Sequence, residues 1–270
     1  MTPELAVPGF AAAVSLTSFA GDRATAAIPP GWAQGRATFG GIVLGQALVA
    51  ARRTLPEPRP CRSLVATFPA PIGVGEVDIR LRELRHGRAV SSVQVEVAQG
   101  GELGCVALVS FGGARPSAVD VPAPPPPPLP PPDELPLLLP LGAPGPEFTR
   151  FVDYRLAFGA RPYAGADVRE LGGWCRFPGE RQVGEEHRLG LVDAWPSPAV
   201  SRFAAPAPAA SMTWAIELLP IEPVPEPDGW WLYHAELESA RDGYAHAAAR
   251  LWSPAGRLAA LSRQVVAIFG

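Results

Sequence analysis

Residues 38–55, TFGGIVLGQALVAARRTL, are the stretch of this 270-residue chain that decides its fold. Apolar side chains follow one another so densely over 39–55 that the segment predicts a helix buried around most of its circumference. Gly40, Gly41 and Gly45 are poor helix formers and need a reason. One reason is close packing against a sheet. The other is access to the backbone N–H groups at the helix N-terminus, which can bind an oxyanion or phosphate. The two are compatible.

The strands that follow this helix recur in the second half of the chain. Residues 61–113 and 210–270 each contain a strand ending in Pro-Ile, a long strand running to a Gly turn, a further strand to a second turn, and a closing apolar strand. A period above 100 residues indicates a duplicated domain. We predict a second helix over 184–195 and strands over 15–28, 61–68, 76–85, 89–98, 103–111, 151–159, 166–177, 211–219, 230–239, 244–252 and 258–268.

These elements predict an α+β fold with two tandem copies of an antiparallel sheet, each wrapped around a central helix. We expect the two copies to pair edge to edge into one continuous antiparallel sheet with both helices on its concave side, because an isolated copy would expose a sheet edge and an apolar helix flank. Proline dominates 115–147, so this segment cannot form helix or central strand and favours polyproline II. We therefore predict an N-terminal domain over 1–114, a Pro-rich linker over 115–147 that runs outside as a tether, and a C-terminal domain over 148–270. An SH3-type ligand role for the linker is the alternative.

Composition excludes several classes of function. The net charge of −3 and pI near 5.9 argue against nucleic-acid binding. All 23 basic residues are Arg, so a P-loop, a Schiff base and a Ser-Lys dyad are excluded. With no signal peptide and no apolar run of about 18 residues, we expect a cytoplasmic protein without membrane insertion. The widely spaced Cys61, Cys105 and Cys175 favour buried free thiols, with a catalytic cysteine as the alternative.

Three segments resemble the acyl-CoA thioesterase II family, which carries two hotdog domains in one polypeptide. They are TFGGIVLGQAL at 38–48, SARDGYA at 239–245 and GRLAALSRQVV at 256–266. The resemblance covers nearly the whole chain outside the Pro-rich segment, and the first and third segments are moderately specific together. It implies a double hotdog fold and hydrolysis of an acyl-CoA, without cofactor or metal.

The resemblance also implies a site. In that family a carboxylate, a hydroxyl and a glutamine from the second hotdog hold the hydrolytic water, and the helix N-terminus of the first hotdog faces them. The glutamine falls on Gln264 and the hydroxyl on Ser239. The carboxylate falls within ASMTWAIELLP, at Thr213, Met212 or Ala210, none of which is acidic; Thr213 is favoured because it is polar. Helix-terminal amides of Gly40 and Gly41 would then bind the oxyanion or substrate.

The duplication offers an independent check. Counting from the shared glycines, Gln264 corresponds to Val109 and Ser239 to Glu83. Counting back from Pro-Ile, Thr213 corresponds to Leu64. A buried strand position normally holds Val or Leu, and a glutamine there costs desolvation unless it is hydrogen-bonded. The asymmetry favours one site in the second half. The alternatives for Gln264 are a solvent-facing edge position and a satisfied core amide.

Asp193, in LGLVDAW, is the nearest candidate to replace the missing carboxylate; alternatively it caps a turn or pairs with an Arg. His187 and Glu217 are weaker candidates, and no His pair has metal-ligand spacing. We expect a thioesterase acting on medium, long or modified acyl-CoA, and a homo-oligomer, dimer or larger. The competing functions are a non-catalytic acyl-CoA-binding hotdog protein and an acyl-thioester hydratase or dehydratase, since fold alone cannot choose among them.

Overall fold

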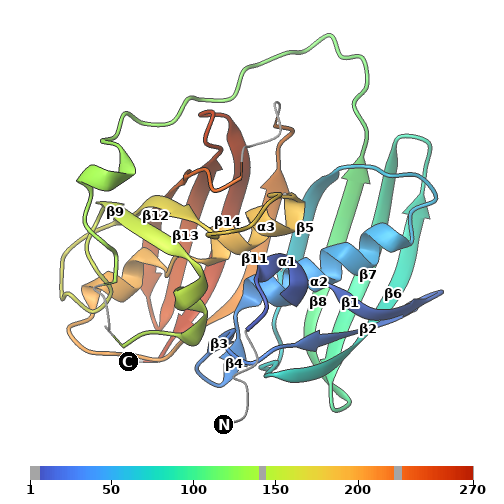
Figure 1. Ribbon diagram of the computed structural model, residues 1–270, viewed down its shortest axis with the longest axis horizontal. Helices are drawn as coiled ribbons and strands as arrows, with labels where there is room; N and C mark the ends of the chain where they lie inside the picture. The colour runs from blue at the N-terminus through green and yellow to red at the C-terminus, as the bar shows by residue number, and fades with distance from the viewer. Residues whose placement is uncertain (1–6, 140–143, 222–226, 270) are drawn as a thin grey trace.

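The computed structural model describes residues 7–139, 144–221 and 227–269. Twelve strands form one antiparallel sheet in the order β1-β2-β6-β7-β8-β5-β11-β14-β13-β12-β10-β9 (Figure 1). The strands are β1 Leu16–Ala20, β2 Arg23–Ile28, β5 Cys61–Thr67, β6 Gly75–His86, β7 Val90–Gln99, β8 Glu102–Gly112, β9 Asp153–Phe158, β10 Glu170–Arg176, β11 Ala209–Leu218, β12 Trp231–Arg241, β13 Tyr244–Trp252 and β14 Leu258–Ile268.

One strand pair at the centre of the sheet joins the two halves of the chain. β5 pairs with β11, with Thr67 opposite Thr213 and Ser63 opposite Glu217. Within this sheet, the strands from the first 112 residues lie on the β5 side, and those after residue 152 lie on the β11 side. The expected edge-to-edge pairing into one continuous antiparallel sheet is therefore confirmed.

Two antiparallel helices lie side by side on one face of this sheet: α2 Gly40–Arg53 and α3 Glu185–Asp193 (Figure 1). Most of α2 is buried, as its sequence predicts. The helices approach so closely that a Cβ on Gly41 would lie 2.8 Å from the Gly190 Cα. Close packing therefore accounts for Gly41. A short helix, α1 Phe10–Ala13, packs on both halves: Phe10 stacks on Phe177 at 4.5 Å and lies edge-on to Trp32 at 5.7 Å.

Some elements differ from the prediction. The segment 15–28 is not one strand but the hairpin β1–β2, because Gly21 adopts a φ of +63° at the turn. The two-residue strands β3 Ala33–Gln34 and β4 Ala37–Thr38 pair just before α2 and were not predicted. Three 3-10 helices, η1 Pro132–Glu134, η2 Glu147–Phe151 and η3 Pro198–Arg202, were also not predicted.

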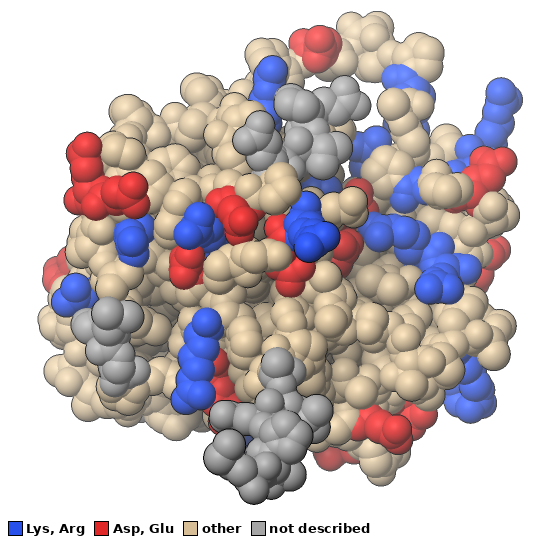
Figure 2. All heavy atoms as spheres, viewed as in Figure 1, with Lys and Arg blue, Asp and Glu red and all other residues tan. Residues whose placement is uncertain are grey.

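The surface and the thiols follow the expectations from composition. Figure 2 shows acidic and basic side chains interspersed on the face that carries the helices. Cys61, Cys105 and Cys175 are buried free thiols, and burial raises the pKa of each to about 12. Within the described ranges, no helix has the length and apolar character needed to cross a bilayer.

Candidate active site

The N-terminus of α2 is capped from the neighbouring helix. The N-cap residue Phe39 has no side chain that can accept a hydrogen bond, and Gly40 and Gly41 follow it. The Gly41 N–H instead donates to Oδ2 of Asp193, the last residue of α3, at 2.8 Å. A Cβ on Gly40 would lie 2.9 Å from that same oxygen. Glycine at both positions therefore lets a carboxylate reach the amides of α2.

Asp193 is an unusual carboxyl group. The residue is half-buried, and the desolvation of its carboxyl group raises its pKa to about 7, a rise that the backbone hydrogen bonds from Gly41 and Gly40 oppose only in part. Its charge lies at the unfavourable C-terminus of its own helix but at the favourable N-terminus of α2. No Arg or His forms an ion pair with it among the residues that the structure describes. A carboxyl group with a pKa near 7 can act as a general base at neutral pH.

Packing at the end of α3 fixes the position of Asp193. Trp195 stacks on Tyr233 at 5.6 Å, with the ring planes only 7° apart, and meets Tyr154 edge-on at 5.4 Å. The Tyr154 hydroxyl donates to the Ala194 carbonyl at 2.9 Å, which satisfies one of the free carbonyls at the helix C-terminus. The carboxylate is thus held by a rigid aromatic frame.

A second polar group lies on β14. The Gln264 side-chain amide donates to the Ser211 hydroxyl on β11 at 2.7 Å, and both residues are partly buried. Gln264 stands opposite the buried Trp214 and Ala247, so its side chain lies on the helix-bearing face of the sheet. Ser211 was not singled out by the sequence, although it lies within the segment where the carboxylate was sought.

Gln264 and Asp193 lie at the same end of the molecule. The start of β11 meets the end of β5, since the Phe68 N–H donates to the Met212 carbonyl at 3.1 Å. The chain then continues to Ile72, whose carbonyl accepts from the Thr38 N–H, two residues before α2, at 2.6 Å. The Gln264–Ser211 pair and the N-terminus of α2 therefore flank one short stretch of chain, on one face of the sheet.

The structure does not bring the other two expected residues to this place. Thr213 is exposed and stands opposite Val265, one position along from Gln264, so its side chain projects from the opposite face. Ser239 is exposed and stands opposite the exposed His246, which lies between the buried Ala245 and Ala247. It too projects away from the helices.

The weaker candidates also lie elsewhere. Glu217 is exposed on β11, where it stands opposite Ser63. His187 is buried at the N-terminal end of α3, six residues from Asp193, and its Nδ1 accepts from the Gly184 N–H at 3.1 Å. No group of three His, Cys, Asp or Glu side chains suited to a metal ion occurs in the described part of the chain.

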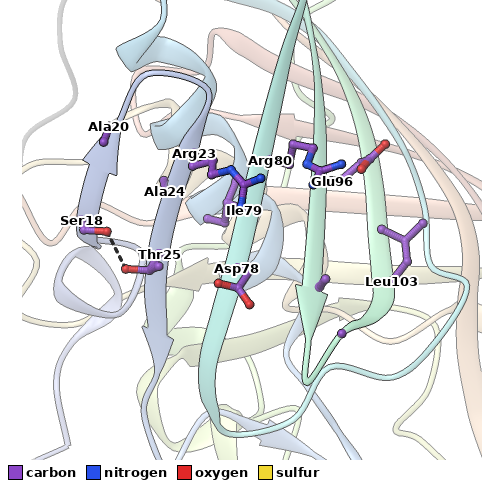
Figure 3. Close-up of a pocket in the computed structure, with 12 residues that line it drawn as sticks. Ser18, Ala20, Arg23, Ala24, Thr25, Asp78, Ile79, Arg80, Glu96 and Leu103 are labelled. Carbon is purple, nitrogen blue, oxygen red and sulfur yellow. Dashed lines mark hydrogen bonds between the residues drawn. The ribbon is translucent and has the colours of Figure 1, made fainter.

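Two hollows lie on the sheet face away from the helices. One, of about 510 Å³, crosses β1, β2, β6, β7 and β8, and Figure 3 shows the Ser18 and Thr25 hydroxyls pointing toward one another in it, 2.8 Å apart. The other, of about 430 Å³, includes Glu238 and Arg263, which form an ion pair. Neither hollow includes Asp193 or Gln264, so both are separate from the candidate site.

Two family models match the chain. The model of the acyl-CoA thioesterase N-terminal domain matches residues 28–112, and the model of the acyl-CoA thioesterase C-terminal domain matches residues 122–268. Together they cover most of the sequence. The search of curated proteins found no match.

Solved structures share the fold over nearly their whole length. A conserved protein of unknown function with a hot dog fold from Alicyclobacillus acidocaldarius is 24% identical, with a TM-score of 0.83 and coverage of 97% of this chain and 98% of its own. The tesB protein of Mycobacterium avium subsp. paratuberculosis and an acyl-CoA thioesterase II from Mycobacterium marinum are both 20% identical. Their TM-scores are 0.78 and 0.76, and each alignment covers 97% of this chain and 98% of the other. At these identities, the likeness shows a hotdog fold.

Proposed function

Because the chain belongs to the acyl-CoA thioesterase family, and is thus a thioester hydrolase, we propose that it hydrolyses a medium-chain, long-chain or modified acyl-CoA at the N-terminal end of α2. The observation that carries this proposal is the Asp193 carboxyl group, held on the Gly41 amide with a pKa of about 7. The partly buried Gln264–Ser211 pair at the same end supports it.

In the proposed reaction, Asp193 acts as the general base. Its carboxylate takes a proton from water while the oxygen of that water attacks the thioester carbonyl carbon. The tetrahedral intermediate then collapses, the carbon–sulfur bond breaks, and the protonated Asp193 returns the proton to the CoA thiolate. The products are free acid and CoA, and no covalent enzyme intermediate forms. A base with a pKa near the working pH serves both transfers.

Gln264 and Ser211 position the water and the carbonyl group. A glutamine amide has two N–H donors, and one of them donates to the Ser211 hydroxyl. The other has no acceptor among the residues that the structure describes and would donate to the water or to the developing oxyanion. Ser211 replaces Ser239 in the proposed site. Thr213 takes no part, since it projects from the opposite face of the sheet.

The proposal changes the role of Gly40 and Gly41. Their amides were expected to bind the oxyanion or substrate, yet Asp193 already accepts from them. We assign these amides to orienting the base. Water positioning by such preorganised groups is worth several powers of ten in rate, because the reacting atoms no longer have to find one another.

The same account includes a tandem double hotdog with the boundaries 1–114, 115–147 and 148–270. Matching irregularities support it. β6 has a bulge between Glu83 and Arg85, opposite Val93, and β12 has one between Leu237 and Ser239, opposite Ala247. Bulges are retained features of related sheets. Aligning the two bulges makes Arg85 the counterpart of Ser239 in the first half. Counting along the sequence had given Glu83, two positions away. A cytoplasmic location and self-association to a dimer or larger remain part of the proposal.

The test is a panel of acyl-CoAs from acetyl to palmitoyl, with released thiol followed by a chromogenic disulfide reagent and no metal or nucleotide added. We expect release above the uncatalysed rate with at least one medium or long chain. An uncatalysed rate at every chain length, together with tight binding of an acyl-CoA, would instead favour the non-catalytic binding protein.

A further inference from the structure

The Pro-rich segment is not a free tether. It arches over the outside of the molecule after β8 and then lies against the second half (Figure 1). Within it, Pro126, Pro127, Leu129 and Pro132 are partly buried, whereas Pro125, Pro128 and Pro131 are exposed. Three of the partly buried residues, at 126, 129 and 132, recur at every third position, as expected for a polyproline II helix with one face on a surface. Pro131 has φ −60° and ψ 156°, as that conformation requires.

Two tryptophans hold the backbone of this segment. The Trp252 indole N–H donates to the Pro124 carbonyl at 3.1 Å, and the Trp174 indole N–H donates to the Pro130 carbonyl at 3.0 Å. The two carbonyls are six residues apart, which is two turns of polyproline II. Proline can only accept on its backbone and an indole can only donate, so the pairing is complementary.

The buried face of the segment meets an apolar surface. Leu129 packs on a cluster formed by Leu232, Trp252 and Leu258, with Trp174 at its edge. Trp174 stands opposite Leu232, and Leu232 opposite Trp252, so these side chains share one face of β10, β12 and β13. Pro126 lies over the β13–β14 turn, 3.6 Å from where a Cβ on Gly256 would be.

Aromatic side chains with indole donors, aligned along an apolar groove, are the means by which recognition modules bind polyproline II peptides. We propose that the surface formed by Trp174, Trp252, Leu232 and Leu258 is a polyproline II-binding groove. Residues 124–132 of the same chain fill it as an intramolecular ligand, and a peptide of that sequence can replace them in trans.

The tether sets the conditions of the test. A ligand joined to its site by a short flexible chain has an effective concentration on the order of millimolar, so added peptide must compete against that. The experiment therefore uses the full chain with its own ligand weakened by Pro126→Ser and Leu129→Ser. Its circular dichroism and melting temperature should show a folded protein. If this double variant is unfolded, the single variant Leu129→Ala is used instead.

Fluorescein-labelled peptide with the sequence of residues 122–132, PAPPPPPLPPP, is titrated and its anisotropy followed. The weakened chain should bind the peptide at least 10-fold more tightly than the unchanged chain. Binding should disappear when Trp174→Ala and Trp252→Ala are added. A peptide with serine at positions 126 and 129 should not bind, whereas one with serine at 125 and 128 should.

The paired peptides make the proposal specific. Both carry two serines, and they differ only in which face of the polyproline II helix is altered. Equal binding of the two peptides would overturn the proposal, because the groove would then not read the third-residue period. No detectable binding to the weakened chain at several millimolar peptide would overturn it as well.

Discussion

The carboxylates at the two ends of the α2–α3 helix pair have contrasting partners. Where α3 begins, Glu185 forms an ion pair with Arg52 and accepts from the Cys61 N–H at 3.0–3.1 Å. Beside it, burial alone would raise the pKa of Glu186, but its interactions with His187, with its own backbone and with the charge of Arg52 lower it to about 2. Where α2 begins, the only hydrogen-bond donors to Asp193 in the described part of the chain are backbone amides, and its pKa rises to about 7.

A carboxylate at a helix N-terminus can therefore serve either structure or chemistry, depending on its other partners. Cations and amides together keep a carboxylate ionised, so it binds and does not exchange protons near pH 7. Amides without a cation, in a desolvated place, leave a carboxyl group that changes its protonation near neutrality. The comparison predicts that only the Asp193 end is catalytic.

The largest expected effect is on turnover, and it tests whether the two ends of the helix pair differ. Asp193→Asn keeps an oxygen that can accept from the Gly41 amide but removes the base, so kcat/KM should fall by roughly 10²- to 10⁴-fold at pH 8. The matched variant at the other end is Glu185→Gln. It should keep turnover within about twofold and lose on the order of 1 kcal/mol of stability, because a partly buried ion-pair network loses a charged partner. Equal losses of turnover would show that the two ends do not differ.

A second pair of variants compares corresponding positions in the two halves of the sheet. Gln264→Ala should lower the turnover number by roughly 10- to 1000-fold, through lost water positioning and oxyanion stabilisation. Val109→Ala, at the corresponding position of the first half, removes two methyl groups from a fully buried side chain. It should lower the melting temperature and leave turnover nearly intact. Similar turnover losses in both variants would rule out a site confined to the second half.

Sequence reasoning was most successful where a pattern repeats many times. The buried helix over 39–55, the recurring strands and their pairing into one sheet all follow from apolar periodicity and from the duplication. A single turn is harder to predict: Gly21 breaks 15–28 into a hairpin, though the alternation runs through it.

The site was harder to predict because an error of one residue in aligning a strand places its side chains on the wrong face of the sheet. The register aligns Gln264 and Trp214 with Val109 and Leu64, whereas counting back from Pro-Ile aligned Thr213 with Leu64. Because a shift of one residue moves every side chain to the other face, the count selected Thr213 instead of a residue on the helix-bearing face. Ser211 lies next to a register shift of β11 that no sequence pattern marks. Asp193 could be proposed from its chemistry, but its contact with Gly41 spans 152 positions.

A third prediction concerns stability and pH. The pKa of Asp193 in the folded protein, about 7, exceeds its ordinary value of 3.8, so between these values the folded state keeps a proton that the unfolded state has released. This group's contribution to stability is therefore full below pH 4 and is lost as the pH rises toward 7. Asp193→Asn lacks that loss. Its free energy of unfolding, relative to the unchanged protein, should rise by on the order of 1–3 kcal/mol from pH 4 to pH 8 in urea titrations. A constant difference would mean that the pKa is not raised.

The smallest expected effect separates the two hydroxyl groups. Ser211→Ala removes the acceptor of the Gln264 amide, and turnover should fall by roughly 2- to 10-fold, as for one neutral hydrogen bond. Ser239→Ala and Thr213→Val alter the opposite face and should change turnover by less than twofold. A larger loss in either of these than in Ser211→Ala would return the site to the residues that the sequence suggested.

The most direct test of the account is the pH dependence of kcat/KM for the unchanged protein and for Asp193→Asn, measured from pH 5 to 9 on the best acyl-CoA of the panel. We predict that kcat/KM of the unchanged protein falls below an apparent pKa near 7, about tenfold for each further pH unit, because the base must be ionised. Asp193→Asn should have a low kcat/KM without that inflection. If Asp193→Asn retains the full rate and the same pH profile, Asp193 is only the cap of α2, and the proposed base is wrong.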